Sequence, residues 1–234
     1  MKKPRYETIL MDADETLFDF ERAAREAIEK TMRRNGLPFG EGTWLLYRRY
    51  NDEVWAEFEQ GKLSKPQLQR ERFVRLFRKL GISADIETVN RTYIQSLGEG
   101  SYILPGAYEL CRTLYSSCGL YIVTNGIAQV QESRFAASPL KPYIRKMYVS
   151  ENIGYQKPQR EFFDAVLKDL KVTDRRSVII LGDSLSSDMA GGANAGIDTC
   201  WYHPGEDFPP SGLLDGITYR IRELSEFVPI ALGK

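Results

Sequence analysis

The sequence predicts an α/β protein in which helices cover both faces of a parallel sheet and an all-helical segment follows the first strand. Two observations carry this prediction. In the second half of the chain, short apolar runs alternate with helical patterns, as they do when parallel strands are joined by helical crossovers. Between the first strand and that half, residues 20–98 show helical patterns and no convincing strand.

The first strand is expected at Thr8-Ile9-Leu10-Met11, a short apolar run that ends at Asp12, as a buried parallel strand would. In the helical segment after it, glycine, proline and capping residues indicate where one helix ends and the next begins. These breaks are expected near residues 36–38, 61–66 and 81–85.

From Pro105 onward, strands and helices alternate. The expected strands are residues 120–123, 147–149, 178–181, 199–202 and 217–219. The expected helices are residues 106–117, a segment from about 127, and residues 158–170, 185–195 and 222–228. Residues 204–216 are rich in glycine and proline, which is typical of a long surface loop.

The placement of the helical segment predicts two domains. We expect a catalytic core formed by residues 1–18 and 99–234, and a helical cap domain formed by residues 19–98. An insertion at that point would lie above the carboxyl end of the first strand. Ligands bind at this end of open parallel sheets, so the cap is expected to gate a substrate crevice.

Composition excludes some classes of function. Lys plus Arg (32) equals Asp plus Glu (32), and this balance gives no basic surface for a nucleic-acid polymer or an anionic membrane. No apolar run approaches the roughly 20 residues that cross a bilayer. The 3 cysteines are odd in number and form no CxxC pair, which argues against a disulfide framework and favours a reducing cytoplasm.

Polar residues follow the predicted strands one after another. Because parallel strands end at the same edge of a sheet, these residues are expected to converge, although each alone could be a helix cap or a solvated charge. They are Asp12-Ala13-Asp14-Glu15-Thr16, Thr124-Asn125-Gly126, Lys157-Pro158, and Gly182-Asp183-Ser184 with Asp188 five residues later.

The chemistry of phosphoryl transfer accounts for these residue types. Mg²⁺ prefers oxygen ligands, which Asp12 and Asp183 can supply, and grouped carboxylates require a nearby cation. Lys157 can offset charge on Asp12 and on the transferring phosphoryl oxygens. A carboxylate can also act as a nucleophile and divide hydrolysis into two displacements. Asp12 is the better candidate nucleophile because it ends a strand, and Asp14 can serve as the general acid and base.

The remaining candidates support this chemistry. The Thr124 hydroxyl and the backbone amides near Asn125 are expected to bind phosphate oxygens, together with Lys157. Asp188 is expected to orient Lys157 or metal-bound water, or simply to cap the following helix. Thr16 is expected to support the loop by hydrogen bonding rather than to take part in the chemistry.

These residues resemble the motifs of the haloacid dehalogenase superfamily in order and spacing, from the first strand to about Tyr202. The resemblance implies a Rossmann-like core, a helical cap, an Mg²⁺ cofactor, Asp12 as nucleophile and Asp14 as general acid and base. It also implies that magnesium is held by the Asp12 side chain, the Asp14 main-chain carbonyl and Asp183. The dehalogenases of the superfamily lack the second aspartate of the first motif, so Asp14 favours phosphate chemistry.

Residues 12–18 differ from the commoner Asp-x-Asp-Gly-Thr-Leu form of the first motif. With residues 124–126, 199–201 and the cap segment 55–73, they are similar to the bacterial house-cleaning pyrimidine 5′-nucleotidases. This resemblance implies a nucleoside monophosphate as the substrate. In the cap, Trp44, Tyr47, Tyr50, Trp55 and Phe58 could stack on a base. All of these except Tyr50 fall at helical spacings, which favours a core role for most of them. Phe18 is the better candidate for a wall of the substrate pocket.

Two alternatives remain at this point. One is a phosphatase for another small phosphomonoester, such as a sugar phosphate or phosphoglycolate. The other is a phospho-accepting signalling module, because receiver domains also gather acids, a threonine and a lysine around Mg²⁺. Receiver domains are about half this length and lack a cap, and an acid and base at Asp14 favours turnover over storage of the phosphoryl group. The sequence does not indicate an oligomeric state.

Overall fold

The structure is a computed structural model that describes residues 3–205 and 216–234. The chain divides into two compact units. The first, called the sheet unit here, consists of Met1–Asp19, Tyr102–Ala128 and Phe135–Lys234. The second, called the helical unit, consists of Phe20–Ser101 and Gln129–Arg134.

The sheet unit is built on a six-stranded sheet in the order β3-β2-β1-β4-β5-β6, and every neighbouring pair is parallel. The predicted parallel α/β fold is therefore confirmed. Strand β1 lies in the middle, and the chain leaves it first toward β2 and later toward β4, which makes β1 the point where strand order reverses. The strands are β1 (Thr8–Met11), β2 (Gly119–Thr124), β3 (Lys146–Val149), β4 (Val178–Gly182), β5 (Asp198–Tyr202) and β6 (Tyr219–Ile221).

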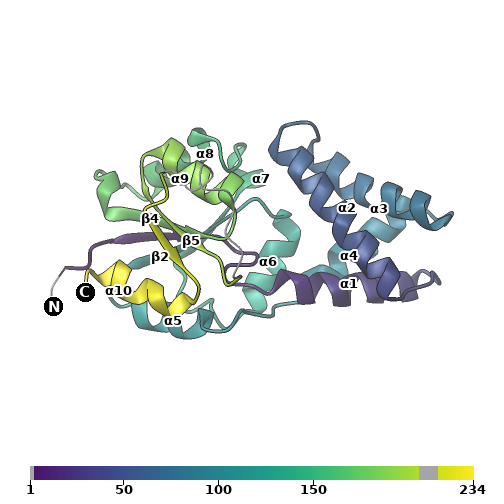
Figure 1. Ribbon diagram of the computed structural model, residues 1–234, viewed down its shortest axis with the longest axis horizontal. Helices are drawn as coiled ribbons and strands as arrows, with labels where there is room; N and C mark the ends of the chain where they lie inside the picture. Colours follow the sequence, from purple (N-terminus) through teal and green to yellow (C-terminus); the bar gives the residue numbers. More distant parts are fainter. Residues whose placement is uncertain (1–2, 206–215) are drawn as a thin grey trace. The chain divides into compact units, whose positions relative to one another are not determined.

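Helices cover both faces of this sheet (Figure 1). On one face, Ile9 and Met11 pack with side chains of α5 (Ala107–Leu114) and α10 (Phe227–Leu232). On the other face, Leu10 packs with side chains of α8 (Arg160–Asp169) and α9 (Ala190–Ala195). This alternation follows from the two-residue period of a strand. The shorter helical segments are α7 (Ser150–Ile153), η1 (Arg175–Ser177), η2 (Leu185–Met189) and η4 (Leu224–Glu226), and α6 spans Ala128–Ala137.

The helical unit contains α1 (Phe20–Arg34), α2 (Glu41–Glu59), α3 (Lys65–Leu80) and α4 (Ile86–Gly98). Local signals end and begin these helices as predicted: Ser64 and Gln67 form a capping box, and Gly81 ends α3 in the left-handed conformation. The aromatic side chains of Trp44, Tyr47, Phe73 and Tyr93 are buried in its interior with ring centroids 5.4–6.1 Å apart. The core role expected for Trp44 and Tyr47 is confirmed. No helix in the described part of the chain combines the length and hydrophobicity needed to cross a bilayer.

In three predicted elements, hydrogen bonds account for a difference from the structure. The strand expected at residues 217–219 instead spans Tyr219–Ile221, because Thr218 and Thr199 exchange hydrogen bonds between their backbone N–H groups and hydroxyls. The helix expected at residues 222–228 is shifted, because the Glu226 carboxylate accepts from the N–H groups of Arg222 and Glu223 and fixes them as a cap. A separate case is the loop expected at residues 204–216, most of which lies outside the described residues.

The third element that differs is the helix expected at residues 185–195. Its first turn, η2, is a π-helical turn in which the Met189 N–H donates to the Ser184 carbonyl five residues back (3.1 Å). The regular helix α9 begins only at Ala190. A π turn of this kind is frequent at functional sites, and this one carries Asp188.

Candidate active site

The centre of the candidate site is Asp12, which directly follows the middle strand β1. Its N–H donates to the Leu181 carbonyl (2.9 Å), so pairing with β4 continues one residue beyond the strand. The side chain of Asp12 is 12% exposed. Asp12 therefore has a fixed backbone and a side chain that reaches the edge of the core, as its position in the sequence predicts.

Lys157 connects three elements of the sheet unit through its ammonium group. Its Nζ donates to Asp12 Oδ1 (2.5 Å), to Asp188 Oδ1 (2.6 Å) and to the Val123 carbonyl (3.0 Å). An ammonium has three protons, so these bonds use all of them. Burial by itself would lower the pKa of Lys157, but the Asp12 and Asp188 carboxylates outweigh burial and raise the pKa. The lysine is therefore held as a cation.

Asp188 reaches this lysine because of the π turn and because residue 182 is glycine. Asp188 is fully buried, and its Oδ2 accepts from the Ser184 N–H (3.2 Å). A Cβ on Gly182 would lie 2.3 Å from Asp188 Cγ, so no larger residue fits without displacing the carboxylate. The side-chain cap of η2 is Ser184, which accepts from the Ser187 N–H. The interpretation of Asp188 as a mere helix cap is therefore wrong, and its predicted contact with Lys157 is present.

Asp183 lies at the end of β4, where two residues hold it. The Thr16 hydroxyl donates to Asp183 Oδ1 (3.2 Å), so Thr16 bonds to a side chain in a distant segment, whereas we expected it to bond within its own loop. The Trp201 indole N–H donates to the Asp183 carbonyl (2.8 Å). Sequence reasoning missed this contact of Trp201. The available signal was weak: a buried indole needs an acceptor, and Trp201 lies opposite Gly182, one residue before the end of the neighbouring strand β5.

At the end of β2, Thr124 and Asn125 make hydrogen bonds that the sequence does not indicate. The Thr124 hydroxyl accepts from the Gly126 N–H (3.0 Å), which makes that amide part of the turn. The side-chain amide of Asn125 bonds to the backbone of Lys157 on both sides: Nδ2 donates to its carbonyl (2.8 Å) and Oδ1 accepts from its N–H (3.0 Å). Lys157 does not begin a helix, since α8 starts at Arg160, and the Lys157–Pro158 bond is cis.

The loop after Asp12 carries Asp14, whose charge adds to the rise in the pKa of Asp12 after the larger contributions of burial and of the Asp188 charge. The carbonyl of Ala13 accepts from the N–H groups of Leu17 and Phe18, which closes the loop. Glu15 in this loop has φ +56°, a left-handed conformation that favours glycine. Phe18 is fully buried in the core against the sheet, so the expectation that it forms a pocket wall is wrong.

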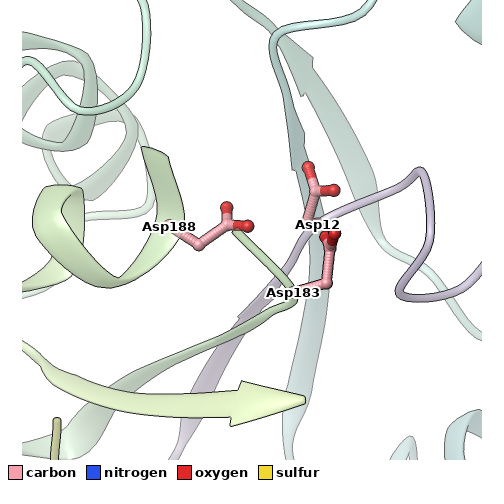
Figure 2. Close-up of side chains that lie close together, drawn as sticks. All are labelled: Asp12, Asp183 and Asp188. Carbon is pink, nitrogen blue, oxygen red and sulfur yellow. The ribbon is translucent and has the colours of Figure 1, made fainter. Parts of the chain in front are cut away.

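The three carboxylates gather from separate segments, as Figure 2 shows. One oxygen from each of Asp12, Asp183 and Asp188 lies within 4.8 Å of the others. Burial raises the pKa of Asp12 to about 7 despite the opposing charge of Lys157, and burial followed by the charge of Asp12 raises the pKa of Asp183 well above its usual range. The Lys157 ammonium balances only one of these three charges. An oxygen-only set with excess negative charge fits a hard divalent cation such as Mg²⁺.

Comparison with known proteins gives the class to which this site belongs. The profile of the haloacid dehalogenase-like hydrolases matches residues 6–196 of the chain. The chain therefore belongs to the haloacid dehalogenase-like hydrolases.

Three similar proteins belong to the comparison. YfnB of Bacillus subtilis, a protein named HAD-hydrolase without a stated substrate, is 35% identical over 97% of this chain and 95% of its own length. Its crystal structure bound to magnesium matches with a TM-score of 0.89, over 97% of this chain and 99% of that chain. The pyrimidine 5′-nucleotidase PynA of Streptococcus pneumoniae is 34% identical over 85% of this chain and 84% of its own length. The pyrimidine 5′-nucleotidase YjjG of Escherichia coli is 29% identical over 95% and 96%.

Proposed function

We propose that this hydrolase is a magnesium-dependent phosphomonoesterase that passes through an aspartyl-phosphate on Asp12. The observation that carries the proposal is the position of the Asp12 carboxylate, fixed at the end of the middle strand by Lys157 and flanked by further carboxylates. A nucleophile held in one geometry avoids much of the entropy cost of bringing reactants together.

In the first displacement, an oxygen of Asp12 attacks phosphorus and the bond between phosphorus and the leaving oxygen breaks. Asp14 gives its proton to that oxygen, which departs as an alcohol. In the second, Asp14 takes a proton from water, the hydroxide oxygen attacks phosphorus, and the Asp12–phosphorus bond breaks. Inorganic phosphate leaves, and both aspartates return to their starting states.

The other residues stabilise charge and position. The Lys157 ammonium is proposed to offset the negative charge that is spread over the phosphoryl oxygens in the transition state, and the Thr124 hydroxyl is proposed to bind one of these oxygens. Magnesium would be held by Asp12, the Asp14 main-chain carbonyl and Asp183, and when bound it would neutralise phosphoryl charge. Thr16 would hold Asp183, and Asp188 would hold Lys157. Magnesium is present in the matched YfnB crystal structure, which supports this part of the proposal.

We propose a pyrimidine nucleoside 5′-monophosphate as the substrate and residues 19–98 as the cap that admits it. Two relatives named as pyrimidine 5′-nucleotidases, one at 34% and one at 29% identity, support this choice. The first motif supports it as well, because it reads Asp12-Ala13-Asp14-Glu15-Thr16 rather than the form with glycine at the fourth position. A sugar phosphate or phosphoglycolate is the alternative substrate.

The test is a panel of monophosphates assayed for phosphate release with Mg²⁺, together with p-nitrophenyl phosphate as a generic ester. We expect UMP and dUMP to give the highest kcat/KM, and a clear preference for sugar phosphates would reject the nucleotidase assignment. The Asp12→Asn variant should fold with the wild-type circular dichroism spectrum and hydrolyse none of the panel. Undiminished hydrolysis by that variant would reject Asp12 as the nucleophile.

A further inference from the structure

Asn125 makes an unusual pair of contacts for a residue expected to bind phosphate. Its side-chain amide faces the peptide backbone of Lys157, with Oδ1 accepting from the Lys157 N–H (3.0 Å) and Nδ2 donating to the Lys157 carbonyl (2.8 Å). Asn125 is 9% exposed and Lys157 is 1% exposed, so solvent cannot easily replace either bond. The pattern also fixes the orientation of the amide, because the reverse orientation would place donor against donor and acceptor against acceptor.

The same strand end holds the other end of the lysine. The Lys157 ammonium donates to the carbonyl of Val123, two residues before Asn125. Lys157 is thus attached to the end of β2 twice, by its backbone at Asn125 and by its Nζ at Val123. With both ends of a four-carbon side chain fixed, little freedom remains in where the ammonium lies between Asp12 and Asp188.

We propose that Asn125 is a positioning residue, which sets the Lys157 ammonium between the two carboxylates by holding the Lys157 backbone and does not itself bind the substrate phosphate with its side chain. Asparagine suits this role because its amide offers one donor and one acceptor at the spacing of a peptide group. Aspartate has the same shape, but an oxygen would replace Nδ2 and face the Lys157 carbonyl, so that two acceptors would meet and the hydrogen bond would be lost. The catalytic consequence rests on the proposed phosphatase function, whereas the backbone contact itself does not.

The experiment compares four variants with p-nitrophenyl phosphate and Mg²⁺. Asn125→Asp removes one bond and keeps the shape, and Asn125→Ala removes both. The single variant Lys157→Met and the double variant Asn125→Ala/Lys157→Met complete a double-mutant cycle. The matched control is Asn194→Ala, because Asn194 is exposed and its side chain donates to the next carbonyl, that of Pro158 (2.9 Å). Thermal unfolding is measured first for every variant.

We expect both Asn125 variants to lower kcat by about 10²-fold, the loss that a misplacement near 1 Å can cause, with KM within about twofold of wild type. The control should stay within about twofold of wild type in kcat. Combined with Lys157→Met, Asn125→Ala should lower activity no further than Lys157→Met alone. A rise in KM at unchanged kcat, or a full additional loss in the double variant, would show that Asn125 contacts the phosphate and would overturn the proposal.

Hydrogen exchange at the Lys157 amide separates this inference from the proposed function. Exchange of that amide should accelerate in Asn125→Ala while the amides of β4 keep their wild-type rates. Unchanged protection at Lys157 would overturn the positioning role, whatever the activity. If the wild-type protein hydrolysed no phosphate ester, the proposed function would fail and the exchange result would still decide the contact. Should Asn125→Ala not fold, Asn125→Asp serves for both measurements.

Discussion

Replacing Gly182 by alanine tests whether the position of Asp188 controls catalysis. The added Cβ would lie 2.3 Å from both Asp188 Cγ and Oδ2 and 2.6 Å from Asp188 Cβ. Ordinary contact begins near 3.4 Å, so the carboxylate must retreat by about 1 Å. The contact is with the base of a fully buried side chain, which is not free to turn into solvent.

A displacement of that size reaches the proposed nucleophile through Lys157. Asp188 Oδ1 is 2.6 Å from Lys157 Nζ, which in turn is 2.5 Å from Asp12 Oδ1. Misplacement by 1 Å can reduce a rate by about 10²-fold, and this corresponds to about 2.7 kcal/mol of activation free energy. Overpacking of this kind also lowers the free energy of unfolding by about 1–3 kcal/mol. Gly182→Ala should therefore lose both activity and stability.

The assay is kcat for p-nitrophenyl phosphate with Mg²⁺, accompanied by thermal unfolding, and the control is Gly192→Ala. A Cβ on Gly192 would lie 2.5 Å from Thr199 Cγ2 and 2.7 Å from Ile180 Cγ2, so it overpacks the same unit without touching Asp188. The control should lose similar stability but keep kcat within about twofold. Equal kcat losses in the two variants, or none in Gly182→Ala, would refute the reasoning.

Two further predictions concern the loop after β1 and the metal. Glu15→Gly should raise the free energy of unfolding by about 0.5–1 kcal/mol. The left-handed φ of +56° is strained for glutamate in the folded state, and relief of this strain outweighs the larger conformational entropy that glycine loses on folding. Denaturant unfolding measures the change. Lys171→Gly serves for comparison, because Lys171 has the same φ of +56°, and a loss of stability in both variants would contradict the argument. Dialysis against EDTA should abolish hydrolysis, and added Mg²⁺ should restore it and raise the Tm of wild type but not of Asp183→Asn. Full activity in metal-free buffer, or an equal rise in Tm for the variant, would count against the metal site.

The sequence predicts the fold well where the signals are local. Strand β1 has the predicted bounds because an apolar run stops abruptly at Asp12. The helix ends in the helical unit are also recoverable, since the capping box at Ser64 and the left-handed Gly81 act within a few residues of their own helix. Strand β6 was misplaced for the opposite reason: Thr199, in another strand, takes the hydrogen bonds of Thr218. No pattern within residues 217–221 records that partner.

The residues of the candidate site also fall into two groups, those that local signals indicate and those that depend on distant contacts. Asp12, Thr124 and Asp183 could be placed because each follows a recognisable strand, and the parallel sheet brings strand ends to one edge. The Lys157 contacts with Asp12 and Asp188 could be expected from charge balance, since buried carboxylates need a cation. The Trp201 contact depends instead on which strand neighbours β4 and on the register between them. Strand order is not visible in the apolar runs themselves.

The contact between the Asn125 side chain and Lys157 is one that residue type alone does not indicate. The expectation that backbone amides near Asn125 bind phosphate oxygens uses only neighbouring residues. The side-chain amide of Asn125 pairs with a backbone 32 residues further along the chain. Backbone groups are the same at every residue, so the sequence cannot indicate which one a side chain will bind. Side-chain contacts with the backbone of a distant catalytic residue are therefore the part of a site that requires a structure, and here they suggest how the position of Lys157 is fixed.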